Sequence, residues 1–233
     1  MTEPLYKQVI NALIQRIANG EYLPGSMLPS ESDLAGDLNV SQGTARKALM
    51  ELEQKGILQR SQGKGTFVTV RTPENSLFHF FRLRTSDGQQ VAPELLSSSV
   101  KVRASTKEEK SLLFNAPKKV YEISRIRTFN DKPLCHELSI IPVELFPGLD
   151  ERNPLPNALY VMFQQAYSCV VISAEEHLTA NQLTDPIASL LHQDAGTPVI
   201  VAQRRARDLL ERVVELRTTT ILTNGTSYNI DLR

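Results

Sequence analysis

The chain has 233 residues, which at about 150 residues per domain predicts one to two domains. Lysine plus arginine and aspartate plus glutamate both total 26, so a polybasic coat is excluded and any contact with nucleic acid has to come from a local patch. No apolar run approaches the ~20 residues of a membrane span, no secretory signal opens the chain, and Cys135 and Cys169 form no CxxC motif, which together predict a cytoplasmic protein without membrane contact.

Three helices are expected in the first 56 residues. Apolar side chains recur every four residues from Leu5 to Ile17, and Asn19-Gly20 ends that pattern. Ser30 is a suitable N-cap for a short second helix, with Asp33 placed as in a capping box. Ser41 caps a third helix that ends at Gly56. Strands are then predicted over 57–60 and 66–70, joined by a glycine-rich hairpin tip over 61–65.

Charge is concentrated where the third helix and the hairpin lie. Residues 41–71 hold six lysines and arginines against two acidic residues, whereas residues 1–40 hold two against five. The third helix places its polar side chains opposite an apolar stripe of Ala45, Ala48, Leu49 and Leu52. Three helices and a basic hairpin in this order predict a winged helix-turn-helix. The alternative is a small helical domain with a solvated charged face.

The rest of the chain predicts an antiparallel sheet with packed helices, class α+β. Residues 71–91 are interpreted as a linker with a strand over 77–81, which gives domains over 1–70 and 92–233. Helices are expected over 106–114, 157–167 and 184–192. Strands are expected over 96–103, 119–129, 133–141, 168–181, 197–208, 212–223 and 226–232.

The strand over 119–129 carries an unusual pattern. Arg125 and Arg127 share one face with Tyr121, Ile123 and Phe129. A buried guanidinium has to be paired, and its planar fork suits a carboxylate or a phosphate. Two interpretations stay open at this point. One is an anion-binding pocket, and the other is a set of structural ion pairs with Glu137 or Glu215.

Several runs of residues resemble known families. The segments Leu28-Pro29-Ser30-Glu31, 40–49 and 62–68 are similar to the DNA-binding half of the GntR family of bacterial transcription regulators. With the winged helix, this predicts DNA contacts from the third helix, the hairpin tip and the cap of the second helix: Ser30, Gln42, Gly43, Thr44, Arg46, Lys47, Gln62, Gly63 and Lys64.

The segment 120–127, Glu137, the run 141–149, and the segments 172–176 and 194–199 resemble the effector-binding UTRA domain of the HutC branch of that family. The resemblance implies a chorismate-lyase-like fold and a small anionic metabolite as effector. It assigns effector contacts to Arg125, Arg127, Glu137, Ser173 and Glu215, and more weakly to Thr85, Ser86 and Tyr228.

Two positions depart from the family pattern, since Ser32 and Gln42 stand where the family commonly has basic residues. Both departures predict an operator that differs from the usual one. We expect a repressor that binds double-stranded operator DNA as a homodimer, with no metal and no cofactor. An enzyme is the competing class because this fold also hosts a lyase, but the sequence shows no Ser/His/Asp or Cys/His set.

Overall fold

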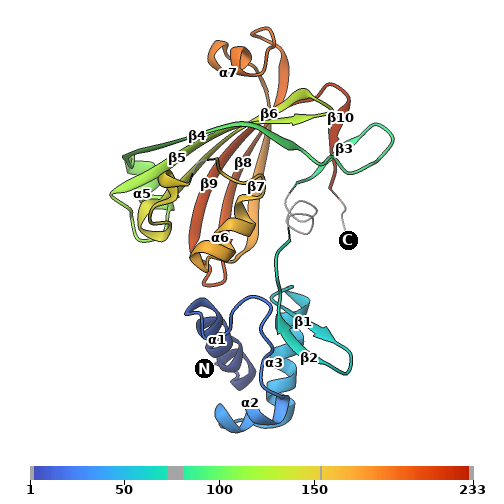
Figure 1. The fold of residues 1–233 in the computed structure, drawn as a ribbon, viewed down its shortest axis with the longest axis vertical. Coiled ribbons are helices and arrows are strands. Elements are labelled where there is room, and N and C mark those ends of the chain that lie inside the picture. The colour runs from blue at the N-terminus through green and yellow to red at the C-terminus, as the bar shows by residue number, and fades with distance from the viewer. Residues whose placement is uncertain (1–2, 73–80, 153, 231–233) are drawn as a thin grey trace.

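The computed structural model describes residues 3–72, 81–152 and 154–230. It consists of a small helical head and a larger domain built on a curved sheet, with the head below the sheet in Figure 1. The head and the sheet domain each have a hydrophobic core of their own. Among the described residues, no helix combines the length and the apolar character that crossing a membrane requires.

The head is a winged helix-turn-helix, as predicted. It contains α1 (Leu5–Ala18), α2 (Glu31–Asp37) and α3 (Gln42–Gln54), followed by the hairpin of β1 (Leu58–Ser61) and β2 (Gly65–Val68). The Ser30 and Ser41 hydroxyls accept hydrogen bonds from backbone N–H groups three residues ahead, which caps α2 and α3. The apolar stripes of the helices meet in one core, and this leaves the start of α3 exposed.

The larger domain is α+β, as predicted, and its main sheet has six antiparallel strands in the order β4-β5-β6-β9-β8-β7. The strands are β4 (Glu94–Ala104), β5 (Lys119–Phe129), β6 (Lys132–Pro142), β7 (Val171–Gln182), β8 (Pro198–Asp208) and β9 (Val213–Leu222). β5 has the predicted bounds, and it turns into β6 through Asn130 and Asp131, both in the left-handed region. The predicted effector residues Arg125, Arg127, Glu137 and Glu215 lie on β5, β6 and β9.

Helices cover both faces of this sheet. α6 (Leu159–Tyr167) packs on the face that bears Tyr121 and Ile123, together with the short helices η1 (Val143–Leu145) and η2 (Leu149–Glu151), which were not predicted. α5 (Lys107–Leu112) lies within the predicted helix over 106–114 and begins with a capping box of Thr106 and Glu109. α7 (Asp185–Leu190) packs against Ile126 and the ends of β8 and β9, on the opposite face from α6. α6, η1 and η2 therefore cover the face that bears Tyr121 and Ile123.

A separate two-stranded ladder joins β3 (Leu83–Thr85) to β10 (Thr226–Tyr228). Pairing with β3 ends at Tyr228, before the end of the predicted strand over 226–232, whose residues 231 and 232 lie outside the described residues. The predicted strand over 77–81 lies, except for Phe81, outside the described residues. The proposed domain boundaries at 70 and 91 stay a prediction.

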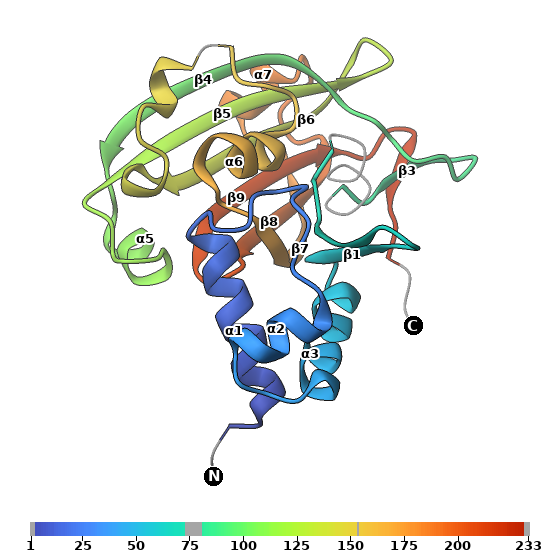
Figure 2. The ribbon, with the colours of Figure 1, turned by 60° about the horizontal axis from the view of Figure 1, so that its bottom comes forward.

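The head lies against the end of the sheet domain next to α6 (Figure 2). Leu209, in the β8–β9 turn, is buried in the core of the head, and Val170 and Ile172 at the start of β7 pack on the same core. On α6, the buried amide of Gln164 accepts from the Arg71 N–H at 2.8 Å and donates to the Thr69 carbonyl at 3.1 Å. The chain leaving the wing is thus attached to α6 at two points.

Candidate DNA-binding surface and effector site

The first turns of α3 present the polar side chains that sequence analysis singled out. Gln42, Gly43, Arg46 and Lys47 are exposed, and Thr44 is half-buried with its hydroxyl 2.8 Å from Ser41 Oγ. The opposite face of α3 is the buried apolar stripe, which packs into the core of the head. An exposed polar helix start on an apolar base is the arrangement that reads the major groove in helix-turn-helix proteins.

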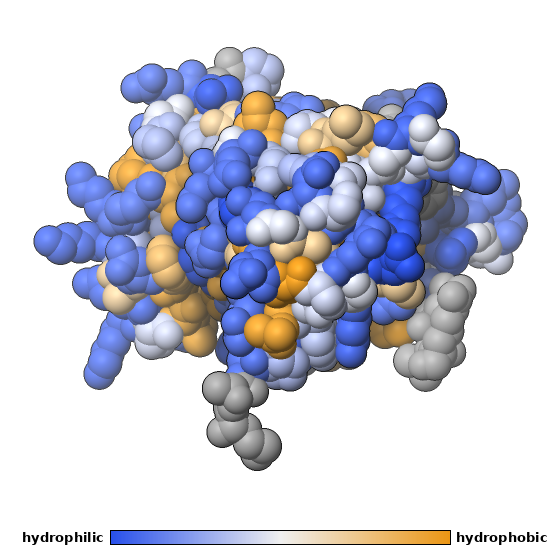
Figure 3. Space-filling model, turned by 90° about the horizontal axis from the view of Figure 1, so that it is seen from below, coloured by the Kyte–Doolittle hydropathy of each residue, from blue (hydrophilic) through white to orange (hydrophobic). Residues whose placement is uncertain are grey.

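The wing adds a second group of exposed residues. Gln62, Gly63 and Lys64 form the tip of the β1–β2 hairpin, where Gly63 has a φ of 71°. At Gly65, which follows, a Cβ atom would lie 3.1 Å from Met27 Sδ, so a side chain there would crowd the base of the wing. Seen from below, this end of the molecule is mostly hydrophilic, with small hydrophobic patches between (Figure 3).

Three of the predicted DNA-contacting residues also make contacts within the head. The Lys47 ammonium lies 3.9 Å from the centre of the Tyr6 ring, so it faces α1. Ser30 caps α2, with its hydroxyl bonded to the backbone and carboxylate of Asp33. Arg46 forms an ion pair with Glu31.

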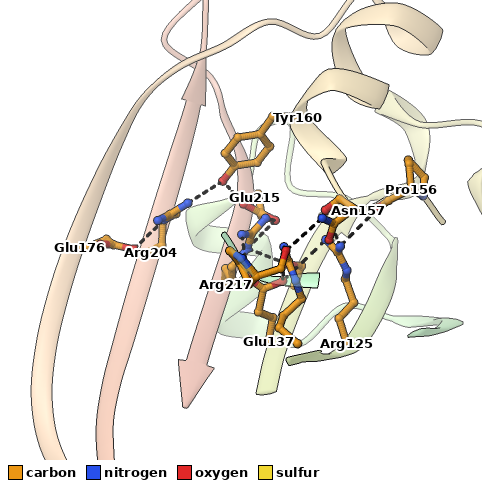
Figure 4. A network of polar contacts seen from close by, with 12 residues as sticks. Arg125, Glu137, Pro156, Asn157, Tyr160, Glu176, Arg204, Glu215 and Arg217 are labelled. Atoms are coloured by element: carbon orange, nitrogen blue, oxygen red, sulfur yellow. Dashed lines mark hydrogen bonds and ion pairs between the residues drawn. The ribbon is translucent and has the colours of Figure 1, made fainter. Parts of the chain in front are cut away.

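The larger domain holds a buried network of arginines and glutamates under α6 (Figure 4). Its centre is Glu137 on β6, which is 2% exposed. The Glu137 carboxylate lies 3.6 Å from Arg125 Nη1, 3.3 Å from Arg127 Nη1 and 3.5 Å from Arg217 Nη1. These residues come together because β5, β6 and β9 are neighbours, with Arg125 opposite Glu137 and Glu137 opposite Thr219 in the register.

The network continues across β9, β8 and β7. Glu215 pairs with Arg217 at 2.8 Å and accepts from the Tyr160 hydroxyl at 2.5 Å. Arg204 then pairs with Glu176 at 2.7 Å, and Glu176 also accepts a hydrogen bond from the Tyr228 hydroxyl. The side chains of the whole network thus link the five strands from β5 to β9 with α6 and β10.

The start of α6 lies at the other end of the network. Arg125 donates to the Asn157 carbonyl at 2.6 Å, and Arg127 donates to the Pro93 carbonyl at 3.0 Å. The side-chain amide of Asn157 also donates to Pro93, at 3.0 Å. The segment that leads into α6 is therefore fixed by the arginines.

Burial and neighbouring charges shift the pKa values of Glu137 and Arg125 in opposite directions. Burial alone would raise the pKa of the Glu137 carboxyl, but the charges of Arg217, Arg127 and Arg125 lower it to about 2. Burial lowers the pKa of Arg125 to about 10, against the attraction of Glu137, so the side chain is charged at neutral pH. The pKa of Tyr160 is raised to about 12, chiefly by burial, which keeps its hydroxyl a hydrogen-bond donor.

Charges of both signs meet in this network. Among the described residues, it contains four arginines and three glutamates, namely Arg125, Arg127, Arg204, Arg217, Glu137, Glu176 and Glu215. Within the described residues, the buried Nε atoms of Arg125 and Arg127 have no hydrogen-bond partner. A cavity of about 20 Å³ lies between Glu137, Arg204, Arg217 and Tyr228, with room for about one water molecule. A larger ligand therefore has to displace the side chains that fill the site.

Five of the eight predicted effector residues meet in this network: Arg125, Arg127, Glu137, Glu215 and Tyr228. The structure does not bring the other three to it. Thr85 bonds within the turn after β3, to Asp87 and Gln89, and Ser86 is exposed beside it. Ser173 is exposed on β7. Their assignment stays a prediction that rests on the resemblance.

No role was predicted from the sequence for Arg204, Arg217, Tyr160 or Glu176. Glu215 and Arg217 alternate along β9 as Arg125 and Arg127 do along β5, so the period of two was a usable signal. Tyr160 gave no such signal, because a tyrosine in an apolar helix is usually a core residue.

Comparison with known proteins extends these observations. Residues 5–68 match the family described as bacterial regulatory proteins, gntR family, and residues 87–225 match the UTRA domain. The HTH-type transcriptional repressor NagR of Bacillus subtilis is 31% identical over 229 residues, which cover 97% of this chain and 87% of that protein. A probable fructoselysine utilization operon transcriptional repressor of Shigella flexneri is 29% identical, with 97% and 94% covered.

A solved structure shares the fold. The possible transcriptional regulator YydK of Bacillus subtilis superposes with a TM-score of 0.56 at 20% identity, and the match covers 99% of this chain and 100% of that one. The two matched domains, the relatives and the shared architecture agree, and they exclude the enzyme that sequence analysis kept as the competing class. The chain belongs to the GntR family of bacterial transcription regulators, in the branch that carries a UTRA domain.

Proposed function

We propose that this regulator is a repressor whose affinity for operator DNA falls when a small anion binds under α6. The observation that carries the proposal is that the buried Nε atoms of Arg125 and Arg127 have no hydrogen-bond partner among the described residues. A buried donor without a partner is unfavourable. An anionic ligand would accept hydrogen bonds from both Nε donors.

The same site favours a ligand with hydroxyl or amino groups beside its acidic group. Glu137, Glu176 and Glu215 are acceptors within a few ångströms of the arginines, and Tyr160 and Tyr228 add hydroxyls. Sugar acids, sugar phosphates and sugar–amino acid conjugates combine these features. The name of the Shigella relative, which refers to fructoselysine, supports a ligand of this class.

α6 offers a physical route from this site to the DNA-binding head. Asn157 and Tyr160, at its start, bond to the network, and Gln164, one turn after Tyr160, holds the chain that leaves the wing. A ligand that displaces Asn157 or Tyr160 shifts the helix and with it the two bonds of Gln164. The anion thereby favours a head arrangement different from the one that binds the operator.

The proposed repressor acts as a homodimer in the cytoplasm, with domains over 1–70 and 92–233. A coupling of about 1–3 kcal/mol is typical of allosteric proteins and corresponds to a roughly 5–150-fold loss of operator affinity. The coupling free energy equals the difference between the binding free energies of the anion for the two head arrangements.

The test uses hexose phosphates, aldonic acids and fructoselysine as probes, and the DNA sequence that the protein selects from a random library. A probe that fits should raise the melting temperature of the wild type and weaken operator binding. Arg127→Ala should abolish both effects and keep operator binding without probe. Arg103→Ala is the matched control, because it removes an arginine from the separate ion cluster with Glu109 and Glu122. A folded Arg127→Ala protein with normal release would show that the arginines are structural.

A further inference from the structure

We infer that Glu31, the first residue of α2, determines operator specificity by positioning two arginines on the DNA-binding surface. This inference rests on DNA binding by the head and is independent of the effector. Glu31 is acidic and lies on a surface that meets a polyanion, so it opposes DNA binding in general. Its ion pairs with Arg46 and Arg60 indicate that it orients these two side chains.

The Glu31 carboxylate bridges the recognition helix and the wing. Its Oε2 lies 2.8 Å from Arg46 Nε on α3, and its Oε1 lies 3.1 Å from Arg60 Nη2 on β1. Arg60 Nε also lies 3.3 Å from Glu53 Oε2, at the end of α3. The three elements that approach DNA are thus joined through one carboxylate.

The two arginines are left with different capacities to bind DNA. Among the described residues, Arg46 pairs through its Nε alone, so both terminal nitrogens stay available for a bidentate contact, and its side chain is 56% exposed. Within the same part of the chain, Arg60 pairs with the two glutamates through Nε and Nη2, which leaves Nη1. The geometry therefore makes Arg46 the DNA-contacting residue and Arg60 the residue that fastens the wing.

Glu31 lies where a helix favours an acidic side chain. It is the first residue of α2, where the unpaired N–H groups of the helix start favour a negative side chain, and Ser30 caps the same turn. Its side chain is 22% exposed, so solvent screens the pairs only in part. Without the carboxylate, Arg46 would sample more rotamers and Arg60 would be free to bind any phosphate.

This arrangement predicts opposite effects on two kinds of DNA. Glu31→Gln should bind the selected operator more weakly, because Arg46 loses its fixed orientation. The same variant should bind random DNA more tightly, and the plot of log affinity against log salt should steepen by about 0.9, the value for one additional phosphate contact. The ratio of operator to random affinity should fall by about tenfold, near the discrimination of one bidentate base contact.

The experiment compares Glu31→Gln with Glu51→Gln by titrating both DNAs at several salt concentrations. Glu51→Gln changes the charge of the head equally, and Glu51 forms no ion pair among the residues that the structure describes. The double variant Glu31→Gln with Arg60→Gln should return random-DNA affinity and its salt slope to wild-type values, while the operator contact stays weak. Equal losses on both DNAs, or the same ratio in both single variants, would overturn the inference and leave Glu31 a structural residue.

Discussion

Glu137 is the residue on which the buried network depends. It faces three arginines from β5 and β9 at 3.3–3.6 Å, with almost no solvent contact. Burying such a carboxylate is unfavourable unless guanidinium groups compensate for its lost hydration. Removing it would leave three arginines facing one another, so its loss should destabilise the fold by about 3–5 kcal/mol at neutral pH.

The pH dependence of this effect follows from the pKa of Glu137, which is about 2 in the folded protein against an ordinary value of 4.5. A lowered carboxyl pKa stabilises the fold above pH ~5, and the contribution is lost as the pH falls toward 2. Glu137→Gln should therefore melt well below the wild type at pH 7, and the difference should shrink by pH 3. Melting curves of both proteins from pH 3 to 7 provide the measurement, with exposed Glu144→Gln as control. A difference that stays constant with pH would contradict the ionised state of Glu137.

Gln42 stands where the family commonly has a basic residue, and we expect this difference to change the base that α3 reads. It is the first, exposed residue of α3, where its amide can bond adenine N6 and N7, whereas arginine prefers guanine O6 and N7. Gln42→Arg should shift the sequence selected from a random library from adenine to guanine at one position of each half-site. Identical selected sequences would show that position 42 does not read a base.

At the scale of elements, the sequence predicted those features that depend on residues close to one another in the chain. The cap of α3, the bounds of β5 and the shared face of Arg125 and Arg127 follow from local rules, and all appear in the structure. The arginines that share Glu137 with them could not be predicted from the sequence. Arg217 and Arg204 are brought to Glu137 by the order β6-β9-β8, which joins strands about 70 residues apart and leaves no local signal.

The position of α6 between the network and the head leads to a prediction on coupling. Gln164 makes two hydrogen bonds to the chain at Thr69 and Arg71, each worth about 0.5–1.5 kcal/mol. Their sum is similar to a typical allosteric coupling of 1–3 kcal/mol. Gln164→Ala should therefore bind the anion and the operator but lose most of the release.

The operator affinities with and without anion measure this loss, in wild type, Gln164→Ala and the neighbouring exposed Gln165→Ala. Gln165→Ala should respond as the wild type does, because its side chain lies outside the contact with the wing. Full release by Gln164→Ala would place the route to the head elsewhere.

At the scale of the whole molecule, the core of the head meets one end of the sheet domain. Among the described residues, Leu209 of the sheet domain is buried in the core of the head, and Val170 and Ile172 pack on that core. Domains of one chain commonly change their relative orientation unless the interface between them is large and hydrophobic. The head can therefore change its orientation without unfolding, as ligand-controlled release requires.

The last prediction concerns assembly on DNA. One head presents a single α3 and one wing, and so few base contacts that a monomer would bind weakly. Two heads related by a two-fold axis double these contacts if their half-sites lie about one helical turn, 34–36 Å, apart on the same side of the duplex. We expect a dimer in sedimentation analysis and a palindromic selected site. Inserting about half a turn, 5 base pairs, should place one half-site on the opposite side and reduce the affinity toward that of one head, whereas a full-turn insertion should retain more of it. Equal affinity for all three spacings would show that each head binds independently.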